Sequence, residues 1–157
     1  MSWFFKGKEV TREEMPEWVE GFVYRITHIP SSRYYIGKKT LFTNRNVKIG
    51  KRELARLKEE RKSKGIGGRA PAKKFVRKES DWETYYSSND WIKNQVKEGN
   101  EKDFHREILQ FCPTKKSMTY YEVFWQMKEE VLLDEFALNE NISGKFYKKD
   151  LETKQQK

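Results

Sequence analysis

Two short segments rich in aromatic and β-branched residues lie close together near the N-terminus and constrain the fold most strongly. They are residues 21–28 and residues 33–38, and the turn-forming stretch 29–32 separates them. This pattern predicts an antiparallel hairpin. Tyr24 and Tyr35 occupy the centres of the two strands, so the hairpin would hold two phenols side by side, in front of the most basic stretch of the chain.

The composition indicates one modest domain with appendages. The 157 residues are 36% hydrophobic and 36% charged, and an aromatic content of 15% argues against disorder. Cys112 is the single cysteine and cannot form an internal disulfide. The sequence shows neither a signal-peptide pattern nor an apolar run near the roughly 20 residues of a membrane span. We therefore expect a cytoplasmic (intracellular) protein with no membrane partner.

The positive charge is concentrated in one part of the chain. Residues 33–78 contain 17 Lys and Arg but 3 Glu, a net charge of +14, whereas the rest contains 16 basic and 21 acidic residues, a net −5. A basic segment beside a mildly acidic body is typical of proteins that bind a polyanion, most commonly the phosphate backbone of a nucleic acid. The alternative is a solvated linker whose lysines only keep the protein soluble.

Capping and periodicity patterns predict the remaining elements. Residues 1–20 form an N-terminal arm whose segment 11–19 begins with a capping box and is a short helical candidate. Residues 51–64 are helix formers that end at a Gly- and Pro-rich stretch, inside a basic excursion from 48 to 78. Further expected elements are a short helix at 88–97, a strand at 104–111 and a long helix at 116–134.

The long helix carries a carboxylate in an unusual place. Glu122 lies opposite one apolar stripe and beside a second. The first stripe is Tyr120, Val123, Phe124, Met127 and Val131, and the second is Tyr121, Trp125 and Leu132. Two stripes indicate a helix buried on much of its circumference, so Glu122 would line a cleft bounded by aromatic side chains. The alternative is that Thr119 and Glu122 form a capping box that serves only the start of the helix.

Five positions along the chain carry a family resemblance. Val23-Tyr24 is followed 11 residues later by the motif Tyr35-Ile36-Gly37, and Arg45 lies ten residues beyond Tyr35. Glu122 and Asn139 come later, after Tyr86-Ser87-Ser88 and a lone strand. This ordered series, which spans residues 21–146, resembles the GIY-YIG nuclease superfamily and in particular its phage-encoded homing-type endonucleases.

The sequence departs from the pattern of this superfamily at two positions. Phe22 stands where the first motif usually has glycine, and Ile49 stands after Arg45 where many members have a histidine. The second departure removes one candidate general base or phosphate ligand. Lys38, Lys39 or Tyr86 would then have to share its work.

The resemblance implies a division of labour in phosphodiester hydrolysis. Tyr24 would be the general base toward the attacking water, and Tyr35 would hydrogen-bond the phosphate or that water. Arg45 would contact the scissile phosphate. Glu122 would hold one Mg²⁺, or another divalent cation such as Mn²⁺, to stabilise the leaving oxygen. Asn139 would orient the Glu122 region rather than react.

These inferences lead to an expected architecture and function. We expect an α/β (α+β) domain at 21–147, with a small three-stranded, mainly antiparallel sheet flanked by helices, and a polar tail at 148–157. Its function would be metal-dependent DNA cleavage, and a homodimer on DNA is one arrangement that could cut both strands. The alternative is a non-catalytic DNA-binding module on the same fold, which Phe22 and Ile49 would explain. Candidate DNA-binding residues are Lys39, Lys48, Lys51, Arg52, Arg69, Lys73 and Lys74.

Overall fold

The computed structural model of the protein describes residues 2–68 and 73–152, with Arg45 and Phe75 described by their backbone alone. The chain divides into two compact units. The first, which we call the main unit, combines Met1–Leu41 with Asp81–Lys157. The second, the ribbon unit, is Phe42–Ser80. Each unit is described by itself.

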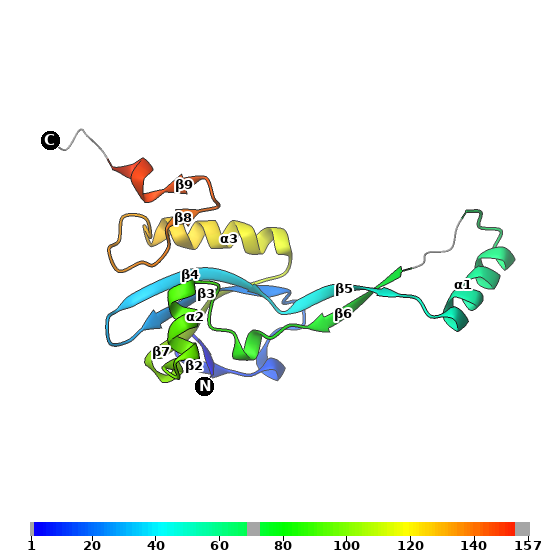
Figure 1. The fold of residues 1–157 in the computed structure, drawn as a ribbon, viewed down its shortest axis with the longest axis horizontal. Helices are drawn as coiled ribbons and strands as arrows, with labels where there is room; N and C mark the ends of the chain where they lie inside the picture. The colour runs from blue at the N-terminus through cyan, green and yellow to red at the C-terminus, as the bar shows by residue number, and fades with distance from the viewer. Residues whose placement is uncertain (1, 69–72, 153–157) are drawn as a thin grey trace. The chain divides into compact units, whose positions relative to one another are not determined.

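The helices and strands follow one another in the order of Figure 1. The strands are β1 (Trp3–Phe5), β2 (Lys8–Val10), β3 (Gly21–His28), β4 (Arg33–Thr40), β5 (Phe42–Lys48), β6 (Lys73–Glu79), β7 (Phe104–Cys112), β8 (Asn141–Ile142) and β9 (Phe146–Tyr147). The α-helices are α1 (Lys51–Ser63), α2 (Asp90–Lys97) and α3 (Lys115–Lys128). Short 3₁₀ helices cover Arg12–Glu14, Trp82–Thr84, Glu101–Asp103 and Lys148–Leu151.

The predicted tyrosine hairpin is confirmed as β3 and β4. The two strands are antiparallel, with Tyr24 opposite Gly37 and Ile26 opposite Tyr35. The predicted third strand is also confirmed, because β7 pairs antiparallel with β3 on its other side. The mixed α/β class therefore stands.

The expected three-stranded sheet is too small, because the N-terminal residues add two strands. The sheet has the order β2-β1-β7-β3-β4, with β1 parallel to β7 and antiparallel to β2. The helix expected at 11–19 is also wrong, since only Arg12–Glu14 is helical. Pro16 explains this early end: proline disfavours the helical conformation of the preceding residue, and Met15 is extended, with φ −72° and ψ 140°.

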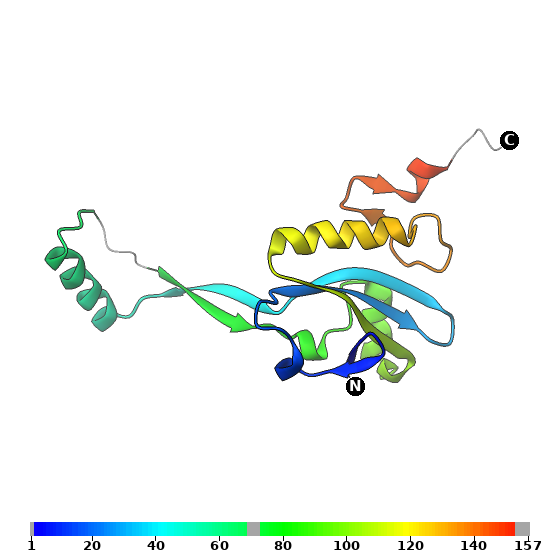
Figure 2. The ribbon, with the colours of Figure 1, turned by 180° about the vertical axis from the view of Figure 1, so that it is seen from behind.

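The two faces of this sheet bury different sets of side chains. Figure 1 and Figure 2 show α3 along one face and α2 on the opposite side. Val23 and Ile36 point toward α3 and join a core that includes Met118 and Val131. Side chains alternate along a strand, so Tyr24, next to Val23, points to the other face, where it packs against Trp3.

Helix α3 differs from expectation in its length and in its buried face. It begins at Lys115, as expected to within a residue, but it ends at Lys128, because Glu130 takes the left-handed conformation with φ 50°. Tyr120 and Phe124, from the first predicted apolar stripe, are 65% and 43% exposed. The second stripe, with Trp125, packs on the core. Tyr120, Phe124 and Met127 of the first stripe are thus exposed, whereas Val123 and Val131 of the same stripe pack on the core.

The helix predicted at 88–97 is confirmed, and the helix-forming residues of the basic excursion form a helix as well. Helix α2 begins as its sequence indicates, since the Asn89 side chain accepts a hydrogen bond from the backbone N–H of Ile92. Helix α1 coincides with the helix-forming segment of the basic excursion, between the antiparallel strands β5 and β6. None of the residues of α1 is buried. Within the part of the chain that the structure describes, no helix is long and apolar enough to cross a membrane.

Candidate active site

A cleft of about 460 Å³ runs along β4, the edge strand of the large sheet in the main unit. Tyr35 enters it from β4, and Trp91 enters from α2. Glu122 and Gln126 enter from α3, and Asn139 from the segment that follows. Side chains from the helices on both faces of the sheet therefore meet at this edge. Three residues that the sequence singled out, Tyr35, Glu122 and Asn139, are among those that line the cleft.

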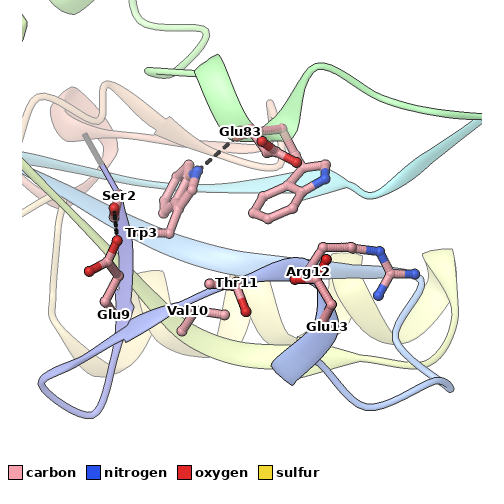
Figure 3. A pocket seen from close by; sticks show the side chains of 9 residues that line it. Ser2, Trp3, Glu9, Val10, Thr11, Arg12, Glu13 and Glu83 are labelled. Atoms are coloured by element: carbon pink, nitrogen blue, oxygen red, sulfur yellow. Dashed lines mark hydrogen bonds between the residues drawn. The ribbon is translucent and has the colours of Figure 1, made fainter.

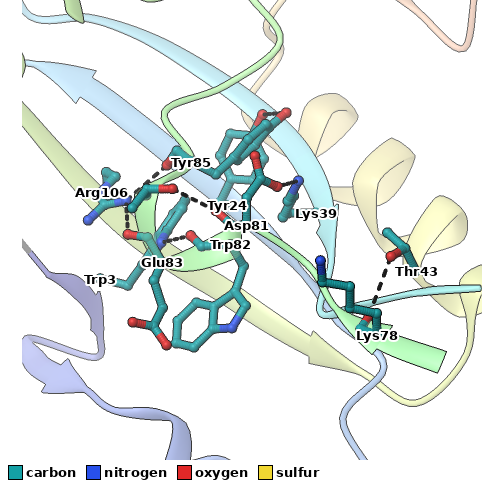
Figure 4. A network of polar contacts seen from close by, with 11 residues as sticks. Trp3, Tyr24, Lys39, Thr43, Lys78, Asp81, Trp82, Glu83, Tyr85 and Arg106 are labelled. Atoms are coloured by element: carbon teal, nitrogen blue, oxygen red, sulfur yellow. Dashed lines mark hydrogen bonds and ion pairs between the residues drawn. The ribbon is translucent and has the colours of Figure 1, made fainter.

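The hairpin places Tyr24 and Tyr35 near each other, with ring centroids 6.4 Å apart. Their surroundings differ. Tyr24 is fully buried, and its hydroxyl oxygen lies 3.5 Å from that of Tyr85 (Figure 4). Tyr35 lines the cleft, and its hydroxyl lies 3.4 Å from the Ser88 hydroxyl. Burial raises the pKa of both phenols, and for Tyr24 it does so strongly, with a further contribution from Tyr85.

Gly37 is the residue that makes room for the buried phenol. A Cβ atom at this position would lie 2.6 Å from the Tyr24 hydroxyl oxygen and 2.8 Å from Cζ of the same ring. Both separations are shorter than any real contact of this kind. The glycine of the Tyr35-Ile36-Gly37 motif is therefore required by the close approach of Tyr24 across the hairpin.

Glu122 lies inside α3 and takes no part in capping it. The helix is capped by Thr114, whose side chain accepts a hydrogen bond from the backbone N–H of Ser117. The alternative of a capping box at Thr119 is thus wrong. Burial raises the pKa of Glu122, while the ammonium and backbone N–H of Lys38 act in the opposite direction. The Lys38 ammonium also donates to the Thr119 hydroxyl, at 2.9 Å.

Asn139 supplies hydrogen-bond partners for the backbone of Ile36 in the edge strand β4. Its Oδ1 accepts from the backbone N–H of Ile36 at 3.1 Å, and its Nδ2 donates to the Ile36 carbonyl at 2.9 Å. Gln126 Nε2 donates to the same carbonyl at 3.0 Å. One side-chain amide thereby replaces a neighbouring strand and fixes β4 between Tyr35 and Gly37. Asn139 therefore holds β4 in place beside the cleft, and the orienting role expected for it near Glu122 stays a prediction.

Asn139→Ala should destabilise the protein by about 1–3 kcal/mol, because it leaves the buried N–H of Ile36 without a partner. Urea unfolding followed by tryptophan fluorescence measures this change. Asn94→Ala, at an exposed position of α2, is the matched control and should change the free energy of unfolding by less than about 0.5 kcal/mol. Equal effects of the two substitutions would contradict the role given to Asn139.

Tyr85 is a site residue that the sequence reasoning missed. Two adjacent tyrosines follow the 3₁₀ turn, and Tyr86 was the one expected to support the chemistry. The structure places Tyr86 against Arg106, with Cζ 4.3 Å from the ring centroid, and it is Tyr85 that reaches Tyr24. Consecutive residues of an extended segment point in opposite directions. The alternation therefore predicts that only one of Tyr85 and Tyr86 can contact the hairpin. It does not identify which of the two does so.

Arg106 fixes the segment that carries Tyr85. Although it lies on β7, it is 2% exposed, and its Nη1 donates to the carbonyls of Glu83 and Tyr85, at 2.9 Å each (Figure 4). Trp3 Nε1 donates to the neighbouring Trp82 carbonyl at 2.7 Å. The signal in the sequence is that Arg106 alternates with the apolar residues Phe104 and Ile108, which puts a charge on the buried face of β7, where arginine is rare without a specific role. The N-terminal strand is thereby tied to the site.

Lys39 lies beside Tyr85, at the edge of the cluster formed by Tyr24, Tyr35 and Tyr85. Its Nζ lies 4.1 Å from the ring centroid of Tyr85 and forms an ion pair with Asp81. The ion pair lowers the pKa of Asp81. Of the lysines expected to share the work of the missing histidine, Lys39 therefore lies near the phenols and Lys38 near the carboxylate.

The remaining candidates lie in the ribbon unit. Arg45 is on β5, and its side chain is outside the described part of the structure. Arg69 also lies outside the described residues. Lys74 donates to Glu53 at 2.8 Å. The other expected DNA-binding residues, Lys48, Lys51, Arg52 and Lys73, are exposed.

A second cavity, of about 310 Å³, lies in the main unit beside β1 and β2 (Figure 3). Its wall carries the carboxylates of Glu9, Glu13 and Glu83, and Ser2 donates to Glu9. This cavity contains none of the residues that the sequence singled out. Because a wall with three carboxylates would repel a phosphate, we place the candidate site in the cleft along β4.

The cleft can accept a hydrated Mg²⁺ ion. Magnesium takes one or two protein carboxylates and keeps several waters, so it does not need a cage of acidic residues. Residues 2–68 and 73–152 contain no group of three or more His, Cys, Asp or Glu side chains suited to a metal. Glu122 offers one carboxylate, and the buried Oε1 of Gln126, in the same wall, has no hydrogen-bond partner. This donor set suits Mg²⁺ better than zinc.

Comparison with known proteins gives one match. A family model described as "Putative endonuclease segE, GIY-YIG domain" matches residues 3–151. Neither the curated proteins nor the solved structures include a significant match. The matched range runs from β1 to the last 3₁₀ helix, so it contains the tyrosine hairpin, the cleft and the whole ribbon unit.

Proposed function

Because the chain belongs to the GIY-YIG endonuclease family of the segE type, we propose that it is a metal-dependent DNA endonuclease that hydrolyses phosphodiester bonds in the cleft along β4. The observation that carries this proposal is the meeting of Tyr35 and Glu122 in one cleft, with the buried Tyr24 phenol behind Tyr35. A carboxylate and a phenol at an open edge suit the binding of a metal ion and a phosphate.

The side chains of the cleft divide the work of binding and orientation. Tyr35 would donate a hydrogen bond to a phosphoryl oxygen or hold the attacking water. Lys38 and Lys39, beside the carboxylate and the phenols, would attract the phosphate backbone. Arg45 would contact the scissile phosphate through charge-assisted hydrogen bonds. The DNA strand would then pass along the edge of the sheet.

Glu122 would hold the Mg²⁺ or Mn²⁺ ion. When bound, such an ion supplies positive charge that stabilises the phosphoryl oxygens and the leaving 3′-oxygen. Lys38 keeps the carboxylate available for this role, because its charge and its backbone N–H favour the ionised form against the effect of burial. Gln126 would add a neutral oxygen to the same wall.

Tyr24 would accept the proton of the attacking water. Its pKa lies well above the ordinary value of 10.0 because the ring is buried, so the phenol is neutral at pH 7 in the DNA-free protein. Only the small phenolate fraction can act as a base. That fraction increases tenfold with each pH unit below the pKa, and cleavage should follow it.

Tyr24→Phe should reduce the nicking of supercoiled plasmid by at least about 10²-fold, the usual contribution of a positioned general base. The logarithm of the wild-type single-turnover rate should increase with pH, with a slope of about one, up to at least pH 9. Both measurements use purified protein with and without Mg²⁺. A pH-independent rate would show that Tyr24 serves as a hydrogen-bond donor and not as the base.

Tyr34→Phe is the matched control. Tyr34 is also a buried tyrosine of the hairpin, but its hydroxyl donates to Asp134 at 2.6 Å and lies outside the cleft. This variant should nick at a rate within about threefold of wild type. If the wild-type protein binds plasmid but does not nick it in Mg²⁺ or Mn²⁺, the protein is a DNA-binding module on the same fold.

A further inference from the structure

The ribbon unit carries the net positive charge of the protein. Residues 42–80 contain 14 Lys and Arg and 4 Glu, a net charge of +10. The remaining residues contain 19 basic and 20 acidic side chains, a net −1. The ribbon unit would therefore contribute most of the electrostatic attraction to a nucleic acid. Most of its described side chains are exposed.

One face of the β5–β6 ribbon presents groups that can read bases. Asn44 lies directly opposite Arg77 in the antiparallel register, and Asn46 is the next residue of β5 on the same face. All three side chains are exposed. The Arg77 guanidinium lies over the Phe42 ring, with Cζ 3.9 Å from its centroid. This contact holds the guanidinium above the ribbon surface.

A purely structural role does not explain these asparagines. Asparagine is disfavoured in strands because its side chain competes for backbone hydrogen bonds. In the described part of the chain, the side-chain amides of Asn44 and Asn46 make no hydrogen bond, whereas Asn89 caps a helix and Asn139 bonds the backbone of β4. Two exposed amides at i and i+2 on one face are therefore available to a ligand.

We propose that this face, Asn44, Asn46 and Arg77, reads base edges in the major groove of duplex DNA. The major groove admits a two-stranded ribbon, and asparagine and arginine form bidentate pairs with adenine and guanine there. Two residues of a strand rise about 6.7 Å, which equals about two base-pair steps of 3.4 Å. Asn44 and Asn46 would thus meet bases two positions apart.

The lysines at the far end of the ribbon would bind the phosphates that flank this groove. Lys48 and Lys73 are paired across the end of the ribbon, and both are exposed. Phosphate contacts position a protein on DNA without reading its sequence. Duplex RNA is a poorer partner, because its deep and narrow major groove excludes a ribbon. The proposal rests on the proposed function only in taking duplex DNA as the substrate.

Selection from a randomised DNA duplex tests this proposal. The full chain with Glu122→Gln is used, so that bound DNA is not cut and enrichment does not depend on cleavage. We expect a short enriched motif that contains A or G. Adding Asn44→Ala and Asn46→Ala should reduce the preference at those positions by about tenfold or more. Affinity for unselected DNA should change by less than about threefold, since phosphate contacts remain.

Two further variants test whether a change in the motif reflects base reading. Lys73→Ala tests the effect of charge alone, and Val76→Ala tests the effect of a substitution elsewhere on the ribbon. Lys73→Ala should weaken binding to all sequences alike and reduce the salt dependence by about one charge. Val76→Ala, on the opposite face and 39% exposed, should leave the motif unchanged. The readout is overturned if the motif survives the double asparagine substitution, or if the Glu122→Gln chain with both asparagines intact enriches no motif. Motif enrichment by a chain that never nicks plasmid retains the readout and rejects the endonuclease.

Discussion

Glu122→Gln should abolish cleavage while leaving DNA binding intact. We expect the rate of plasmid nicking in Mg²⁺ to decrease by about 10³-fold, since a catalytic metal ion contributes several kcal/mol to transition-state stabilisation. The net positive charge lies in the ribbon unit, so binding to a plasmid fragment should change little. Glu122→Ala should behave in the same way, and persistent cleavage by either variant would reject the metal assignment.

The same substitution should make the protein more stable at neutral pH. Burial raises the pKa of Glu122 above its value in the unfolded chain. The stabilising, protonated form is therefore fully populated only below the unfolded pKa, and its contribution is lost as pH increases through the folded pKa. Glutamine resembles the protonated acid at every pH. The variant should thus have a higher Tm than wild type at pH 7, and the difference should vanish near pH 4.

Thermal unfolding with added metal provides the control for both effects. Mg²⁺ should raise the Tm of the wild type and not that of Glu122→Gln, because a ligand stabilises the state that binds it. Glu140→Gln removes an exposed carboxylate from the same cleft and should retain both the metal response and cleavage. Loss of activity with Glu140→Gln but not with Glu122→Gln would move the metal site to the other carboxylate.

Gly37→Ala should reduce both the stability of the protein and DNA cleavage, because the added methyl overlaps with Tyr24. The added methyl would lie 2.6 Å from the Tyr24 hydroxyl oxygen, and neither partner can move freely because Tyr24 is fully buried. Overpacking of this kind costs about 1–3 kcal/mol, or several degrees in Tm for a chain of this length. The phenol must also shift, so we expect nicking to decrease by at least about 10²-fold.

Gly67→Ala is the control for this substitution, because a Cβ there meets no atom within 4 Å and the backbone needs no left-handed conformation. It should leave the Tm and the nicking rate unchanged. A second comparison isolates the cause. In Gly37→Ala combined with Tyr24→Phe, which removes the clashing oxygen, part of the stability should return while activity stays low. Full stability of Gly37→Ala alone would contradict the close approach of Tyr24.

The sequence predicted the hairpin and the cleft better than the edges of the fold. Alternating aromatic and β-branched residues on both sides of a turn determine, almost by themselves, the pairing of the two strands that carry Tyr24 and Tyr35. In contrast, Trp3–Phe5 is a three-residue strand, too short to show a period, and its parallel pairing with β7 depends on contacts distant in sequence. Pro16, which keeps Met15 extended after the 3₁₀ turn at Arg12–Glu14, is the signal in the sequence that the helix stops there.

The sequence could identify a site residue that has no neighbour of the same type, but it could not decide which of two adjacent tyrosines belongs to the site. Glu122 could be proposed from its place beside an apolar stripe, and the cleft confirms that it is not a cap. Tyr85 was missed in favour of Tyr86 because only the anchoring of that segment by Arg106 decides which ring turns toward the hairpin. Such choices depend on tertiary hydrogen bonds that local sequence does not contain.

The ion pair between Lys39 and Asp81 bears on how proteins of this kind could diversify. These two residues stand just before and just after the segment that forms the ribbon unit, and their pairing holds the departing and returning chain together. Leu41 is tied to the same place, since its backbone N–H donates to the Glu20 carbonyl at 2.9 Å. A segment inserted between closed ends can be exchanged or resized with little entropic penalty. Under the proposed base readout, evolution could therefore exchange the ribbon unit, and with it the DNA sequence that is recognised, without altering the residues of the cleft.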